Sequence, residues 1–402
     1  MKSKQFLVLL AAAVVLGGGG LMVLRSKKAD YQASSGQMGG KVLGEIDVNA
    51  VAGIRLTQGT NALNIAKSGD GWSVKERGGY PANFGELADF VRKLADLKVA
   101  QPVRVGPSRL PMLELTKETA TTVELLGADG KALKTLTVGK KHVKGGGAAE
   151  ESSPFGGGAF PDGRYVMAGT DIASVAVVGD PLTGANPKAE DWIAKEFIKV
   201  ELPVAVTVTR AEATNSFRLT RTNEFGDWAL ADAKAGEELD KNKAAGFSSI
   251  LSGPSFNDVI IAPDLKALGL DQPVETVVQT AAGFTYKLRV GKASADDSYP
   301  VQVSVDASLA KERTPGKDEK PEEKTKLDKE FADKLAKQQE KLKAEQAFSK
   351  WTYSVSKWSI DAFLKNRGDL FADKKADAEP GAGAGAGAGA ENPLKFELPG
   401  AK

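Results

Sequence analysis

The sequence predicts an α+β protein in which an N-terminal transmembrane helix precedes two tandem repeats of an antiparallel sheet with one packed helix. Three observations predict this fold class. An apolar segment without charged residues lies near the N-terminus. Stretches of alternating apolar and polar residues, which are typical of half-buried strands, occur in two similar series along the chain. Each series includes an amphipathic helical stretch that can cover one face of a sheet.

The apolar segment covers residues 6–24, which is just long enough for a helix that spans a bilayer core of about 20 residues. A cleaved signal peptide is the competing interpretation, with the glycines at 17–20 as its small-residue cleavage region. We favour the anchor because the apolar run resumes at residues 21–24, which a cleaved signal peptide does not need.

The flanking charges say little about orientation, because basic residues lie on both sides of the segment and almost balance the positive-inside rule. A short N-terminal tail followed by a long body is the usual layout of a signal anchor. This layout favours a body outside the cytoplasm.

The body contains two copies of one unit, and this duplication is the most informative pattern in the sequence. The first copy opens with VAGIRLTQG at residues 51–59 and the second with VAVTVTRA at residues 204–211. In both copies a tryptophan, Trp72 or Trp228, begins the third strand-like stretch. We expect both tryptophans to pack in the core rather than to bind a ligand, because a large aromatic side chain at the start of a strand usually packs against the helix of its domain.

A helical stretch and a hairpin follow in each copy. Residues 84–95 place apolar side chains at three- and four-residue steps, and residues 239–251 form a shorter and weaker version of the pattern. The first hairpin turns at Asp129-Gly130 and ends in LTVGK, and the second turns near Gly283 and ends in LRVGK. The two endings and the two openings are separated by the same offset, so coincidence is a poor explanation.

Each copy also contains an insertion, and the pattern predicts that the two insertions lie at similar places. Residues 144–162 are rich in Gly and Ser and predict a flexible loop, since no Gly-Lys-Ser/Thr ending supports a phosphate-binding loop. Residues 310–348 have nearly balanced charges and predict an exposed helix, whose apolar stripe could also dock on a partner helix or fold back onto its domain. The stripe consists of Leu327, Phe331, Leu335 and Leu342.

These patterns divide the chain into five parts. They are a membrane anchor or signal peptide (1–28), a linker (29–44), a first α+β repeat (45–190), a second α+β repeat (191–371) and a Gly-Ala-rich tail (372–402). The last residues of the tail, NPLKFELPGAK, alternate like a strand, which fits either a short docking peptide or a strand added to the parent sheet.

Composition excludes several classes of function. The 54 Lys and Arg nearly balance the 52 Asp and Glu, so the totals give no general attraction to nucleic acid. The chain has no cysteine, which rules out thiolate zinc sites and cysteine nucleophiles, and its one histidine cannot form a His-based zinc cluster. We therefore assign no catalytic, cofactor-binding or metal-binding residue and predict a protein that is not an enzyme.

A hydrolase is the enzymatic alternative. It would use His142 as its base, although no nucleophile-elbow motif lies near that residue. A pair of carboxylates would be another route, and Asp70, Glu76 and Asp227 are examples of the many acids, but none has a setting that singles it out.

Several short motifs resemble the domain of unknown function 4340 family. They are IRL in the first strand, then DGW, YPAN before a helix that ends in LADLKV, the L-x-V-G-K hairpin endings and ALGLDQP at residues 267–273. The corresponding segment of the first copy, residues 110–113, departs from the family pattern. The resemblance covers roughly residues 45–365 in two copies, and its motifs are short and mostly structural.

The resemblance implies a non-enzymatic accessory or scaffold protein of the bacterial inner membrane. Such a protein has a single N-terminal span and a body that faces the periplasm. The expected partner is a protein of an ABC-transporter or gliding-motility-type complex, and no cofactor is implied. The alternative is a polysaccharide- or small-ligand-binding module, which would be favoured by an apolar pocket lined by aromatic residues at the junction of the two copies.

Overall fold

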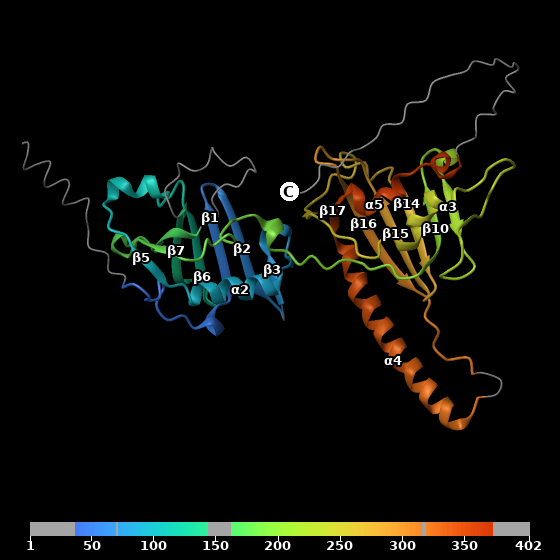
Figure 1. Cartoon of the computed structure of the whole chain (residues 1–402), viewed down its shortest axis with the longest axis horizontal. Helices are drawn as coiled ribbons and strands as arrows, with labels where there is room; N and C mark the ends of the chain where they lie inside the picture. The colour runs from blue at the N-terminus through green and yellow to red at the C-terminus, as the bar shows by residue number, and fades with distance from the viewer. Residues whose placement is uncertain (1–36, 70, 144–161, 316–318, 373–402) are drawn as a thin grey trace, which may run out of the picture.

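The computed structural model describes residues 37–69, 71–143, 162–315 and 319–372. These residues form two antiparallel sheets and a few helices, which confirms the α+β class (Figure 1). No helix in the described part of the chain is both long and apolar enough to cross a bilayer. The transmembrane helix predicted at residues 6–24 lies outside the described residues.

The first sheet has nine strands in the order β4-β3-β2-β1-β6-β7-β8-β9-β5. Alternation produces its buried face, since the side chains of Ile54 and Leu56 in β1 are fully buried while Arg55 between them is half-buried. Helix α2 (Phe84–Ala95) is capped by the preceding Asn83, whose side chain accepts a hydrogen bond from the Glu86 N–H. The strands are β1 (Gly53–Gln58), β2 (Asn61–Ser68), β3 (Gly71–Val74), β4 (Tyr80–Pro81), β5 (Val99–Pro102), β6 (Thr121–Leu126), β7 (Ala132–His142), β8 (Gly163–Ala168) and β9 (Ala176–Val178).

The second sheet has eight strands in the order β12-β11-β10-β14-β15-β16-β17-β13. The strands are β10 (Pro203–Thr209), β11 (Phe217–Thr220), β12 (Ala229–Leu230), β13 (Asp258–Ile260), β14 (Val274–Thr280), β15 (Phe284–Val290), β16 (Ser298–Ala307) and β17 (Thr352–Ser356). The helices of this half are α3 (Lys241–Ala245), α4 (Pro321–Gln346) and α5 (Lys357–Leu364).

The two sheets share one topology, because β1, β6, β7, β8, β9 and β5 follow one another in the same spatial order as β10, β14, β15, β16, β17 and β13. Both predicted hairpins are present, and their turns use Gly130 and Gly283 at φ of 75° and 86°, a region that glycine enters without strain. The duplication inferred from the sequence is therefore visible in the fold.

The expectation that the two insertions lie at similar places is wrong. The Gly-rich segment connects β7 to β8, whereas α4 lies between β16 and β17, whose counterparts are β8 and β9. The sequence contained a signal for this difference, because the first insertion precedes the strand with Tyr165, whereas the second follows the corresponding strand with Tyr299.

The helix expected at residues 239–251 is also shorter than predicted. Only α3, with five residues, is α-helical, and a 3-10 turn follows at Gly246–Ser249. Glycine and serine are poor helix formers, so the segment ends its α-helix at Gly246 although Phe247 and Ile250 are buried.

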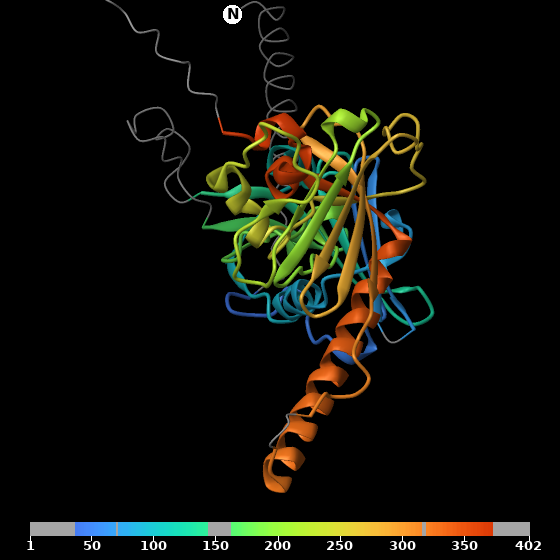
Figure 2. The same ribbon diagram turned by 90° about the vertical axis from the view of Figure 1, so that its right-hand side faces the viewer.

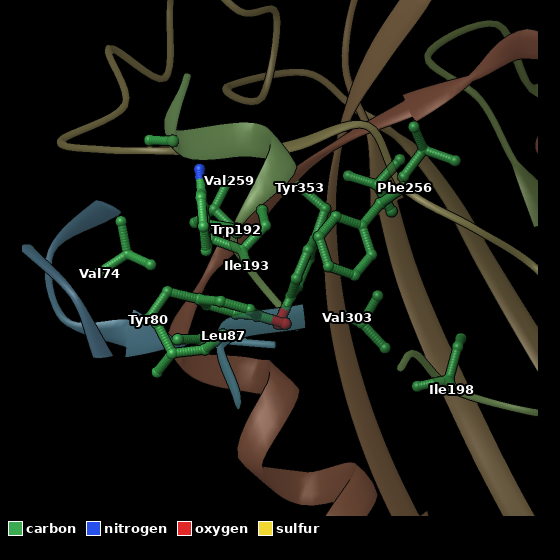
Figure 3. Packing of buried hydrophobic residues seen from close by; sticks show 14 of the residues in the cluster. Val74, Tyr80, Leu87, Trp192, Ile193, Ile198, Phe256, Val259, Val303 and Tyr353 are labelled. Carbon is green, nitrogen blue, oxygen red and sulfur yellow. The ribbon is translucent and has the colours of Figure 1, made fainter. Parts of the chain in front are cut away.

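The buried residues of both sheets form one continuous apolar cluster, and aromatic rings join its two halves. Tyr80 of the first sheet meets Phe256 and Trp351, which lie just before β13 and β17 of the second half, with ring centroids 6.0 and 5.2 Å away. The fully buried Tyr353 is 4.9 Å from Phe256 and 4.7 Å from Phe197, a residue of the segment that joins the two sheets. Figure 3 shows the side chains of Tyr80 and Tyr353 pointing toward one another across this junction.

Candidate interaction site

His142, the residue that a histidine-dependent hydrolase would use as its base, contacts residues at the neighbouring strand β8. His142 is the last residue of β7, and its Nδ1 lies 2.8 Å from Oδ1 of Asp162. Its ring also meets Tyr165 edge-on, with 5.6 Å between the ring centroids. The described contacts of His142 thus join the ends of β7 and β8.

Of the carboxylates noted in the sequence, the two that the structure describes, Glu76 and Asp227, have separate partners. Glu76 accepts hydrogen bonds from the backbone and side-chain nitrogens of Asn64, both at 2.8 Å. Asp227 pairs with Lys241 at 2.6 Å on the surface, and Asp70 lies outside the described residues. In the described part of the chain, no group of three or more His, Asp or Glu side chains is arranged to hold a metal ion.

The two repeated tryptophans pack as expected. Trp228 is buried, its Nε1 donates to Oγ of Ser248, and the Arg221 guanidinium lies 4.7 Å from the ring centroid. Trp72 is partly buried against the core and lines a hollow of about 220 Å³ beside α2.

The junction of the repeats is packed with side chains. Tyr80 contacts Phe256 and Trp351 edge-on, and Phe256 contacts Tyr353 in the same way. The aromatic residues that a junction pocket would need are present, but they form core.

Helix α4, the longest helix of the described residues, is mostly exposed. It has 26 residues, which makes it about 39 Å long at a rise of ~1.5 Å per residue. Pro321 and Glu322 at its start and Lys343 in its last turn suit the helix geometry and dipole. Every residue from 321 to 330 is exposed, and Figures 1 and 2 show the helix projecting beyond the second sheet. The prediction of an exposed helix in this insertion is confirmed.

The C-terminal end of α4, residues 341–346, is its root, and a buried carboxylate holds this root to the body. Glu345 is 5% exposed and accepts hydrogen bonds from the Lys199 backbone N–H and from the hydroxyl of the fully buried Tyr286, both at 2.8 Å. Burial raises the pKa of Glu345, and hydrogen bonds to the ionised form oppose that shift. The root is therefore fixed both to β15 and to the segment that joins the two sheets.

Two basic residues complete the attachment. The Lys341 ammonium donates to the Lys199 carbonyl and pairs with Glu201, both at 2.8 Å. Farther out, Arg313 in the segment before α4 binds Glu319 through two nitrogens and pairs with Asp328 of the helix. The first turns of α4 are thus held to the segment that precedes them.

A pH-dependent effect is expected at the root. Because burial raises the folded-state pKa of Glu345, its contribution to stability is full below the unfolded pKa of about 4.3 and is lost as pH rises through the folded value. Glu345→Gln carries no charge and escapes that loss. We therefore compare the melting temperatures of the variant and wild type. The variant's value minus the wild-type value should be roughly 2–4 °C larger at pH 9 than at pH 4. Thermal unfolding of both proteins at the two pH values measures this; a pH-independent difference would contradict it.

Sequence reasoning missed Glu345, although a signal for it was present. The residue continues the three- and four-residue steps of the apolar stripe through Leu335 and Leu342, so it was a polar residue at a core-facing position. The partners of Glu345 lie 59 and 146 residues away in the chain, and no local pattern indicates them.

The comparisons with known proteins identify one family. Residues 72–273, half of the chain, match the family described as Domain of unknown function (DUF4340). The matched segment starts at Trp72, includes helix α2 and the first hairpin, and ends at Pro273 of the ALGLDQP motif. No curated protein and no solved structure matches the chain significantly. The chain therefore belongs to the DUF4340 family, a membership that its short motifs had already indicated.

Proposed function

We propose that this protein is a non-enzymatic scaffold that uses α4 to contact a protein partner. The observation that supports this proposal is the combination of a fixed root with an exposed outer part, residues 321–330, which form the shaft of the helix. Glu345 and Lys341 hold the root, while the first ten residues of α4 are all exposed. A helix that projects from a well-packed body offers a preformed surface, so a partner need not provide the free energy to order it.

The proposed membrane anchor is inferred from the sequence. Residues 6–24 would anchor the chain in the bacterial inner membrane and place the two repeats in the periplasm. The family resemblance supports an accessory role beside an ABC-transporter or gliding-motility-type complex. The partner in that setting is another envelope protein.

Crosslinking in intact membranes tests the proposal. The test variant carries Lys324→Glu, Lys326→Glu and Lys329→Glu, three exposed changes on the shaft. We expect wild type to recover an envelope partner and the variant to recover at least about fivefold less, which corresponds to roughly 1 kcal/mol of lost contact.

The matched control changes three exposed lysines of the first repeat, Lys67, Lys75 and Lys117, to glutamate. It has the same change in net charge and should keep recovery near the wild-type level. Equal recovery by both triple variants, or no enriched membrane protein with wild type, would refute the role of α4.

A further inference from the structure

A second surface, away from α4, has an unusual exposed aromatic residue. Trp358 lies in the first turn of α5 and is 68% exposed, whereas Ile360 and Phe363 of the same helix are buried in the core. Tryptophan has the largest apolar side chain, so its exposure forgoes a substantial stabilising burial. Tryptophan is also one of the residue types enriched among the few side chains that provide most of the binding energy of an interface.

Trp358 lines two hollows of the surface. Trp358 and Ser359 line the smaller one, of about 190 Å³, together with the loop at residues 246–254. The hydroxyl oxygen of Ser359 is buried and has no hydrogen-bond partner among the described residues. Trp358 also lines a broader and more open hollow of about 610 Å³. An indole that lines both hollows can contact a bound group that enters either of them.

The broader hollow has an excess of negative charge. Asp296, Asp297 and Asp361 line it together with one basic residue, Lys357. Asp296 accepts hydrogen bonds from the N–H and hydroxyl of Ser298, and the hydroxyl bond lowers the pKa of this carboxyl. All three aspartates are exposed, and the structure shows no ion pair for any of them within the described residues.

The loop and the helix that carry these groups are fixed to one another. The Lys357 backbone N–H donates to the Asp297 carbonyl at 3.1 Å, and Oγ of Ser354 in β17 donates to Oγ of Ser298 at 2.9 Å. The backbone segments that carry Asp297 and Trp358 are therefore joined to one another before any ligand arrives.

We propose that Trp358 and the surrounding aspartates bind an organic cation, that is, a guanidinium or primary ammonium group. A cation uses both features of the site, because it stacks on the indole and neutralises the carboxylates. A neutral sugar would use the ring but leave the negative charge uncompensated. The group can come from a basic side chain of a polypeptide or from a free polyamine. The site lies on α5 and does not depend on the proposed role of α4.

The test uses the full chain in detergent micelles, with ¹⁵N-labelled indole groups. The chain has five tryptophans, and Trp358→Phe identifies the signal of Trp358 by its loss. The probes are the peptide Gly-Arg-Gly-Arg-Gly, the same peptide with uncharged citrulline in place of arginine, and spermidine. We expect the arginine peptide to shift the Trp358 signal more than those of the buried Trp192 and Trp228, and the citrulline peptide to shift it little.

Aspartate variants test the electrostatic part. Asp297→Asn combined with Asp361→Asn should weaken binding of the arginine peptide about fivefold, and raised salt should weaken it in wild type. Asp306→Asn, an exposed change in β16, is the matched control and should leave binding unchanged. A shift with spermidine as well as the peptide would indicate a free amine as the source, and a shift with the peptide alone a polypeptide. Equal shifts by the arginine and citrulline peptides, or no shift with any probe, would overturn the proposal.

Discussion

Replacing Tyr353 with alanine is expected to lower the free energy of unfolding by about 3–5 kcal/mol. The side chain is fully buried where the two sheets meet, and its ring contacts Phe197 and Phe256 at centroid distances of 4.7 and 4.9 Å. Its hydroxyl also donates to the Phe348 carbonyl at 3.2 Å. Truncation leaves a cavity among rings that are fixed by several neighbours, so the site can collapse only partly.

Urea unfolding followed by circular dichroism measures this loss. Tyr353→Phe keeps the ring and should cost about 0.5–1.5 kcal/mol, the usual net value of one hydrogen bond. Phe225→Ala, which truncates a side chain that is 85% exposed, is the control and should stay within about 0.5 kcal/mol of wild type. A loss below about 1 kcal/mol for Tyr353→Ala would mean that the junction does not contribute to the stability of the fold.

Replacing Arg77 with alanine is expected to lower the free energy of unfolding by about 1.5–3 kcal/mol. Arg77 follows β3 in the first repeat, and its Nε and Nη2 each lie 2.6 Å from one carboxylate oxygen of Asp258 in β13 of the second. Glu190 adds a third contact at 3.3 Å. The Arg77 and Asp258 side chains are 20% and 29% exposed, so water screens this pair less than a surface pair.

A pair on the surface of the first sheet is the matched control. Arg55 contacts Glu124 at 3.2 Å, but 42% of its side chain is exposed, so Arg55→Ala should cost only about 0.2–1 kcal/mol. A double-mutant cycle with Asp258→Asn isolates the energy of the Arg77–Asp258 contact. If the two arginine variants lose the same stability, the contact between the repeats has no special weight.

Much of the fold could be predicted from the sequence because its determinants are local. Alternation set the strands β1, β6, β10 and β14, and Gly130 and Gly283 marked the hairpin turns. Helix α2 followed from its apolar steps and its Asn83 cap. Only these alternating strands and periodic helices could be predicted so well, because the residues that determine each of them lie within a stretch of about ten.

The candidate sites were less predictable because they depend on distant contacts. Arg77 and Asp258 are separated by 181 residues, and nothing around either one indicates its partner. Trp358 is a partial exception. Ile360 and Phe363 define the buried face of α5, and a residue two positions before Ile360 lies on the opposite side of a helix. The helical period alone could therefore indicate its exposure, although two of the three aspartates beside it, Asp296 and Asp297, come from the β15–β16 loop.

The positions of the two insertions bear on the history of the chain. The Gly-rich segment interrupts the β7–β8 connection, while α4 occupies the connection that corresponds to β8–β9. If either segment had been present in the ancestral single-copy gene, both halves would have inherited it at the same connection. The simplest order of events is that an undecorated unit was duplicated first and that each copy then acquired its own elaboration. On this account α4 is younger than the scaffold that holds it.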